Sequence, residues 1–283
     1  MNFTILIPTY NNLKYLRLFC ESIKINSNFN HQLIFHINDG SDGSYDYINN
    51  NKYQFTHSKT NIGLCSSIKE ASKLIKNQYV LYAHDDMYFC KNWDKFLIEE
   101  VQKQNNNLFY LSGTNISYKD GILNFDCGNT PENFDQIKFD NFCEKDNSPD
   151  LQGSHWAPHL IHRDLWTKVG GFSIEFDPGD GSDPDLCMKL WNEGVRTFKC
   201  ISGFKVYHFG SVTTRKRDIN INNGTKKFLL KYGFNPKFFR KYYLRGGAYS
   251  FYDGPLNEPE KTIISLLELL INKIKYLYYK VSF

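Results

Sequence analysis

Two adjacent carboxylates follow an apolar run in the first third of the chain. Residues 79–82 have the composition of a buried strand, and His84, Asp85 and Asp86 come directly after it. Ligands of open α/β sheets collect beyond the carboxyl ends of the strands, so acidic side chains at this place are well positioned to bind one. Hard divalent cations need such oxygen donors, commonly in sites shared with a phosphate. The segment therefore predicts a cation site, and capping of a following helix by Asp85 and Asp86 is the open alternative.

The segments around this motif alternate between strand and helix patterns. Apolar runs of strand length occupy residues 3–8, 32–38, 53–57, 78–82 and 108–112, and segments with helical spacing or a helix-opening turn separate them. This alternation predicts an α/β fold with a mostly parallel sheet and helices on both faces. Right-handed crossovers bring the carboxyl ends of such strands to one edge of the sheet. We therefore expect polar residues that follow different strands to meet there.

Two later segments depart from this pattern. Residues 130–150 carry six acidic side chains and few strand or helix signals, so we expect a long loop there. Residues 261–283 have the spacing of one long helix with a wide apolar stripe flanked by lysines. Such a helix packs on the catalytic domain or a second subunit, or lies in a membrane interface. We expect packing or a homodimer, with peripheral membrane contact left open.

Composition excludes several classes of protein. The net charge of +4 is small for 283 residues and no basic run dominates, so nucleic acid is not an expected partner. The seven scattered cysteines form no C-x-x-C pair, which predicts reduced thiols and a cytoplasmic protein. We expect no membrane span, because no run of about 18 apolar residues occurs. The chain opens directly with a strand pattern, so we also expect no signal peptide.

Further polar motifs follow the other predicted strands and recur near the middle of the chain. They are Pro8-Thr9-Tyr10-Asn11, Asn38-Asp39-Gly40-Ser41, Asn61-Ile62-Gly63, Asp85-Asp86, Gly170-Gly171-Phe172 with Asp183, and Val206-Tyr207-His208. In this order the set resembles the family 2 glycosyltransferases, which are inverting enzymes of the GT-A fold. The resemblance covers roughly residues 3–215. It implies a catalytic domain over 1–215, with a nucleotide-sugar half to about 115 and an acceptor half after it, and a C-terminal lid and helical extension over 216–283.

The resemblance assigns one group of residues to the nucleotide-sugar donor. Asp39 matches the carboxylate that accepts a hydrogen bond from the nucleobase, although an Asp before Gly is also a common turn former. The remaining donor contacts are implied for Pro8, Thr9, Tyr10, Asn11, Asn61, Gly63 and Asp85. A UDP-sugar is the favoured donor. Core packing is the open alternative for Tyr10.

A second group is implied for the metal. Asp86 and His208 match ligands of a Mn²⁺ or Mg²⁺ ion that bridges to the diphosphate and offsets the charge on the leaving group. Ala83 stands where the family usually has the first carboxylate of its D-x-D motif, so the ligand set is a variant one. A structural histidine is the alternative for His208. Arg215 and Lys216 follow as candidate phosphate contacts, with a solvated loop as their alternative.

The third group would serve the acceptor. Asp183 matches the general base that takes the proton of the acceptor hydroxyl, while capping of a helix that starts at Pro184 is the other role open to it. Ser182 replaces the usual Glu, and Asp180 and Asp185 are nearby rivals for the base. Asp185 is also a candidate acceptor contact. Trp156 is a candidate platform for a sugar ring, with a core position as the alternative.

Together these patterns predict a metal-dependent inverting glycosyltransferase that moves a sugar to a hydroxyl of a glycan, a lipid-linked glycan or a protein. A nucleotidyltransferase is one alternative, but such enzymes usually open with a Gly-rich basic loop, and the turn here is Pro8-Thr9-Tyr10-Asn11-Asn12. A non-catalytic carbohydrate-binding protein derived from the fold is the other.

Overall fold

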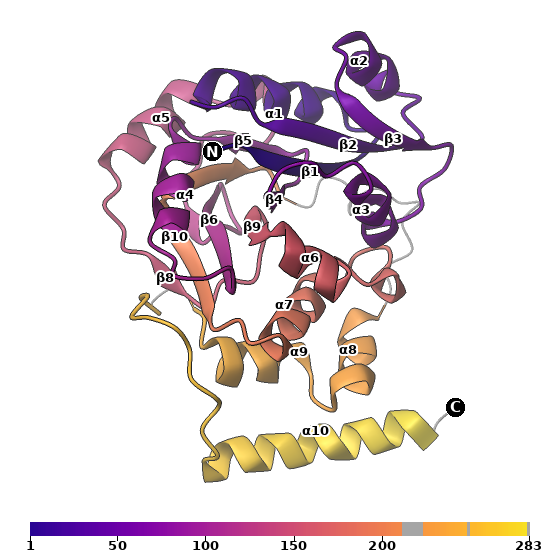
Figure 1. Ribbon diagram of the computed structural model, residues 1–283, viewed down its shortest axis with the longest axis vertical. Helices are drawn as coiled ribbons and strands as arrows, with labels where there is room; N and C mark the ends of the chain where they lie inside the picture. Colours follow the sequence, from indigo (N-terminus) through magenta and orange to yellow (C-terminus); the bar gives the residue numbers. More distant parts are fainter. Residues whose placement is uncertain (211–222, 248–249, 282–283) are drawn as a thin grey trace.

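A computed structural model describes residues 1–210, 223–247 and 250–281 and places a ten-stranded open sheet at the centre of the described chain (Figure 1). Eight strands run in the order β3-β2-β1-β4-β9-β6-β10-β5, with β7 beside β6 and β8 beside β10. The strands are β1 Phe3–Tyr10, β2 Gln32–Asn38, β3 Gln54–Ser58, β4 Tyr79–Tyr82, β5 Met87–Phe89, β6 Phe109–Ser117, β7 Leu123–Asn124, β8 Leu151–Gln152, β9 His159–His162 and β10 Thr197–His208.

Helices flank the sheet and form the C-terminal region. They are α1 Leu13–Asn26, α2 Ser44–Asn50, α3 Leu64–Ser72, α4 Trp93–Gln102, α5 Gln136–Lys145, α6 Arg163–Val169, α7 Ser182–Asn192, α8 Gly224–Tyr232, α9 Pro236–Phe238 and α10 Ile263–Val281, with short turns η1 Pro131–Asn133, η2 Ile174–Phe176 and η3 Phe239–Leu244.

The N-terminal half of the sheet is the parallel arrangement that the sequence predicts. Strands β3, β2, β1 and β4 are mutually parallel along their shared edges, and α1 and α3 lie on opposite sides of them (Figure 1). Side chains on both faces of β1, of β4 and of most of β2 are buried, and Ile5, Leu6 and Ile7 have no exposed surface, whereas β3 at the edge is partly exposed. Burial on both faces explains why these strands appear as continuous apolar runs. The α/β fold class is confirmed.

The other half of the sheet is mixed. Strand β9 lies antiparallel between β4 and β6, and β5 pairs antiparallel with β10. The β5–β10 register sets His208 opposite Met87, and the Phe209 N–H donates to the Asp86 carbonyl over 3.1 Å. This register brings the end of the last strand beside the acidic motif that follows β4.

Residues 130–150 correct the expectation of a long loop. Asp135 caps α5 by accepting a hydrogen bond from the Lys138 N–H over 2.9 Å. The Phe139 ring is fully buried and contacts the rings of Tyr88 and Tyr207. One cap and one deeply packed aromatic side chain hold a short helix whose polar composition gives a weak periodic signal.

A carboxylate from the second half of the chain caps α3 in the first half. Asp177 accepts hydrogen bonds from the backbone N–H groups of Cys65 and Ser66, at 2.7 and 3.2 Å. Gly63 precedes the helix with φ +88°, and a Cβ added there would collide with the Asp177 side chain. Glycine at this position therefore permits both the turn and the close approach. The contact joins the donor and acceptor halves that the sequence predicts.

The C-terminal region packs as a separate layer at one end of the molecule. Helices α8 and α9 lie between the sheet region and α10 (Figure 1). A single helix confirms the prediction for this segment, although the described helix spans Ile263–Val281 rather than the whole of 261–283. No helix of the described chain is both long and apolar enough to cross a membrane. All seven cysteines are free. The predicted domain boundary at residue 215 lies outside the described residues.

Candidate active site

Two consecutive asparagines at the end of β1 connect the acidic motifs of two other strands. The Asn11 side-chain amide donates to the Asp39 carboxylate over 2.7 Å, and the Asn12 amide donates to Asp85 over 3.1 Å. Asp39 follows β2, and Asp85 follows β4. The carboxyl ends of β1, β2 and β4 therefore meet at one edge of the sheet, which is where such sheets bind ligands.

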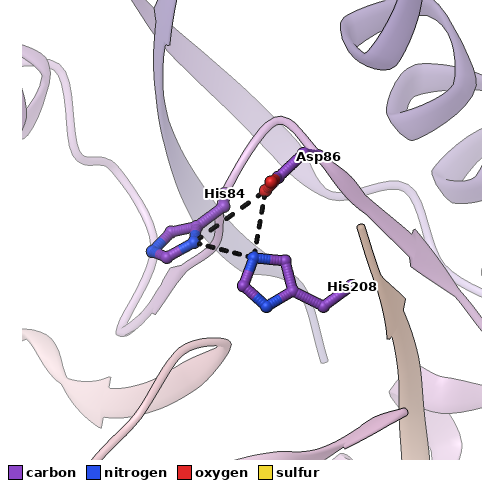
Figure 2. A group of neighbouring side chains, drawn as sticks. All are labelled: His84, Asp86 and His208. Atoms are coloured by element: carbon purple, nitrogen blue, oxygen red, sulfur yellow. Dashed lines mark hydrogen bonds and ion pairs between the residues drawn. The ribbon is translucent and has the colours of Figure 1, made fainter. Parts of the chain in front are cut away.

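Three side chains beyond this edge form a compact cluster. His84, Asp86 and His208 point toward one another, with one candidate ligand atom from each within 4.8 Å of the others (Figure 2). The His208 Nε2 atom lies 3.2 Å from the Asp86 carboxylate and 3.4 Å from His84 Nδ1. His84 Nδ1 lies 3.9 Å from the same carboxylate. The cluster unites the loop after β4 with the end of β10.

The two histidines differ in their protonation. Burial, assisted by the neighbouring His208, lowers the pKa of His84 to about 4 despite the opposing effect of Asp86. Burial also disfavours a charge on His208, but the ion pair and hydrogen bond with Asp86 outweigh it and raise the pKa of His208 above its usual value. The neighbouring Asp86 carboxylate therefore favours a proton on His208 more than on His84.

The donor atoms of this cluster fit a transition-metal cation. Two imidazole nitrogens and one carboxylate oxygen are a ligand set that first-row transition metals accept, while Mg²⁺ prefers oxygen donors. The helix-capping alternative for Asp85 and Asp86 is wrong, because β5 follows them and α4 begins only at Trp93. Both carboxylates are nearly inaccessible, which fits a site that holds a cation rather than a solvated surface.

Asp183 lies in the first turn of α7 and is half-buried. Burial raises the pKa of its carboxyl group from 3.8 to about 7. Among the described residues, no group donates a hydrogen bond to this carboxylate. The buried Tyr82 hydroxyl has a pKa well above its usual value, raised first by burial and then by the nearby charges of Asp183, Asp86 and Asp85. Tyr82 thus lies within electrostatic range of both the metal cluster and the predicted base.

The rival carboxylates near Asp183 are engaged in structural contacts. Asp180 accepts a hydrogen bond from the Gly224 N–H over 2.8 Å. Asp185 has no exposed surface and is bonded to Ser173, Lys231 and Tyr232 at 2.6, 2.7 and 2.7 Å. These contacts tie α7 to α8. Asp183 has no such contact among the described residues, and the roles of Asp183 as base and of Asp185 as an acceptor contact stay predictions.

The donor-side residues surround the end of β1. Asp39 is half-exposed, and hydrogen bonds from Asn11 and then Ser41 lower the pKa of its carboxyl group. Its backbone has φ +59°, so the turn-forming alternative holds, and its contact with the nucleobase stays a prediction. The Thr9 hydroxyl is buried and has no hydrogen-bond partner among the described residues. Pro8 and Tyr10 are half-buried beside it.

The loop before α3 completes this side. The Asn61 side chain accepts a hydrogen bond from the Gly63 N–H over 3.0 Å. Asn38, which the motif contains without an assigned role, donates to the Ser67 hydroxyl and accepts from the Ile62 N–H, both over 2.9 Å. These bonds hold the Asn61–Gly63 turn against the end of β2.

Trp156 is half-buried rather than enclosed in the core, and its indole donates to the Gly113 carbonyl over 3.0 Å. Its role as a sugar platform stays a prediction. Arg215 and Lys216 lie outside the described residues.

Two residues to which the sequence assigned no individual role belong to the site. His84, named only as part of the motif after the fourth predicted strand, joins the candidate metal cluster. Asn12 bridges to Asp85 over a separation of 73 residues. No local pattern marks such a contact.

Comparisons with known proteins agree with this geometry. The sequence pattern of glycosyl transferase family 2 matches residues 4–157, which is more than half of the chain. The chain belongs to glycosyl transferase family 2. A comparison with curated proteins finds no match.

Solved structures confirm the GT-A fold of this family 2 chain. Staphylococcus aureus TarS, residues 1–349, superposes with a TM-score of 0.55 at 15% identity, covering 74% of this chain and 60% of TarS. The TarS complex with UDP-GlcNAc gives 0.52 at 15% identity, with 75% and 61% coverage. GalNAc-T7 with UDP, GalNAc and Mn²⁺ gives 0.56 at 12% identity, with 81% and 47% coverage. The chain therefore spans about three fifths of TarS residues 1–349.

The raised pKa of Asp183 predicts a pH-dependent stability. The folded state keeps the proton up to about pH 7, whereas the unfolded chain releases it near pH 4, so the stabilisation from the neutral form is lost progressively as pH rises from about 4 to about 7. Asp183→Asn removes this loss. We expect urea unfolding to show the variant gaining about 1–3 kcal/mol over the wild type between pH 5 and pH 8.

Asp120→Asn is the matched control, because Asp120 is exposed. It should give no comparable gain. A stability difference between Asp183→Asn and the wild type that does not change with pH would contradict the burial of this carboxylate.

Proposed function

We propose that the chain is a metal-dependent inverting glycosyltransferase that moves a sugar from a UDP-sugar to an acceptor hydroxyl. The observation that carries this proposal is the meeting of the Asp39 and Asp85-Asp86 motifs at one sheet edge, beside the cluster of His84, Asp86 and His208. Asp39 and Asp85 are joined through Asn11-Asn12, and Tyr82 lies within electrostatic range of both Asp86 and Asp183. Each motif comes from a distant part of the chain, and each offers a different chemical environment.

The nucleotide would lie across the ends of β1 and β2. The Asp39 carboxylate, kept ionised by its hydrogen bond from Asn11, can accept from a nucleobase N–H group. Thr9 and Tyr10 pair in register with Ile37 and Asn38, which directly precede Asp39. UDP is the favoured nucleotide, which is supported by the TarS and GalNAc-T7 structures solved with UDP.

His84, Asp86 and His208 would hold the metal ion. We favour Mn²⁺ over Mg²⁺ because two of the three donors are imidazole nitrogens. GalNAc-T7, a structural neighbour, was solved with Mn²⁺. A bound cation would offset the negative charge of the diphosphate as the glycosidic bond breaks.

Asp183 would act as the general base. A carboxyl group with a pKa of about 7 is partly ionised at neutral pH and takes a proton more readily than an ordinary aspartate. It would accept the acceptor's hydroxyl proton as that oxygen bonds to the anomeric carbon, while the bond from this carbon to the diphosphate oxygen breaks. One such displacement inverts the anomeric configuration.

The acceptor is expected to be a glycan or a glycolipid. Trp156 stands in the loop before β9 and is only partly buried, which leaves it available as a platform for a sugar ring. The match to glycosyl transferase family 2 over residues 4–157 argues against the nucleotidyltransferase alternative. Transfer of sugar by the wild type, in the assay with Asp183→Asn, would exclude a non-catalytic carbohydrate-binding protein.

Removing either histidine of the cluster should weaken Mn²⁺ binding. With UDP present, we expect His84→Ala and His208→Ala each to lower Mn²⁺ affinity at least about tenfold, because each deletes one of three ligands. Electron paramagnetic resonance of free Mn²⁺ measures this without any turnover. His155→Ala, which removes a histidine outside the cluster, should bind Mn²⁺ as the wild type does. Unchanged affinity in both cluster variants would refute the metal site.

Asp183→Asn should abolish transfer and leave donor binding intact. Loss of a general base lowers transfer rates by about 100-fold or more. A panel of UDP-sugars with Mn²⁺ would be screened by thermal shift for binding, and the donor so found would be used to assay transfer. Asp180→Asn is the matched control, since an amide oxygen can still accept from Gly224. Wild-type transfer rates in Asp183→Asn would refute the base assignment.

A further inference from the structure

The C-terminal helix α10 turns its polar side chains toward the protein. Ser265 and Asn272 are buried, at 6% and 4% exposure, and the Asn272 side chain accepts a hydrogen bond from the Asn235 N–H over 3.0 Å. The Glu268 carboxylate pairs with Lys241 at 2.6 Å. A surface helix normally buries its apolar stripe and exposes its polar one. This helix has the reverse orientation, so the expectation that its apolar stripe packs on the catalytic domain is wrong.

The opposite face of α10 is apolar along the whole helix. Ile263, Leu267, Leu270, Ile274, Leu277 and Val281 are between 51% and 84% exposed. With 3.6 residues per turn these side chains form one stripe, and neighbouring exposed apolar residues widen it to roughly 160° of the circumference. The face lies opposite Asn272, whose side chain is bonded to Asn235 at the start of α9. Contiguous apolar surface of this extent is typical of a binding face.

Lysines border this apolar face on both sides. Lys273 and Lys280 stand on one edge and Lys275 on the other, and all three are exposed. Glu268 is the only acidic residue of the helix, and Lys241 neutralises it. Long lysine stems can cover apolar surface while their ammonium groups reach a polar layer. The edges of the face are therefore complementary to negatively charged groups.

We propose that α10 binds the surface of a membrane that contains anionic phospholipids, with the helix lying in the plane of the headgroups. A wide apolar face inserts at the boundary of the acyl chains, and flanking lysines contact lipid phosphates. The helix lies on the membrane rather than crossing it, because its buried polar side holds it to the domain and it is not apolar enough to span. A second copy of this chain is a poorer partner for α10. Pairing two such apolar faces would bring their positively charged lysine edges together, and α10 has no unpaired acidic side chain to offset this repulsion.

Vesicle flotation with the full chain tests this surface. We expect the protein to float with vesicles of phosphatidylcholine mixed with phosphatidylglycerol, and to float less with phosphatidylcholine alone or at high salt. The double variant Leu267→Asp, Ile274→Asp should lower the vesicle-bound fraction at least about tenfold. Burying one aliphatic side chain in the membrane raises the partition of the protein onto vesicles about tenfold, and the variant removes two of them. Both positions are exposed, so the fold should persist, as circular dichroism and UDP binding would check.

Ile137→Asp is the matched control, because Ile137 is 74% exposed on α5, away from α10. It should float as the wild type does. Lys273→Glu, Lys275→Glu and Lys280→Glu together should abolish the preference for anionic vesicles. Absence of flotation by the wild type would overturn the proposal. So would equal flotation of the Leu267→Asp, Ile274→Asp variant, or a dimer in light scattering that this variant dissociates without any vesicle binding.

Discussion

The site depends on the two side-chain hydrogen bonds that leave the end of β1 in different directions. Asn11 reaches Asp39 and Asn12 reaches Asp85, so one dipeptide sets the separation between the loops that follow β2 and β4. This arrangement is possible only because the three strands are parallel neighbours, which places their carboxyl ends at one edge. The hydrogen bond from Asn11 also lowers the pKa of Asp39, which favours its ionised form.

Environment rather than residue type separates the roles of the three proposed carboxylates. Asp39 is half-exposed and hydrogen-bonded, and its pKa is lowered. Asp86 is buried against two histidines, where it can share a cation. Asp183 is desolvated at the first turn of α7, with a pKa of about 7. These environments suit, in the same order, an ionised hydrogen-bond acceptor for the nucleobase, a metal ligand and a general base.

The sequence predicted the N-terminal, parallel half of the sheet, where burial of the strands produces recognisable apolar runs. Strands β1, β2 and β4 are apolar runs, and Asp39 and Asp86 follow them as expected. It failed where the deciding contacts are distant, because α5 depends on Phe139 packing against Tyr88 and Tyr207. The amphipathic pattern of α10 predicted a helix but not which face the protein covers, because that follows from Asn235 and Lys241.

The central claim is that residues remote in the chain form one cleft for a cation, a diphosphate and an attacking hydroxyl. Anomalous diffraction at the manganese edge, from crystals grown with Mn²⁺ and a UDP-sugar, tests it most directly. The account predicts a manganese peak bounded by His84, Asp86 and His208, with the nucleobase at Asp39 and the anomeric carbon facing Asp183. A manganese peak elsewhere, or Asp183 turned away from the sugar, would contradict it.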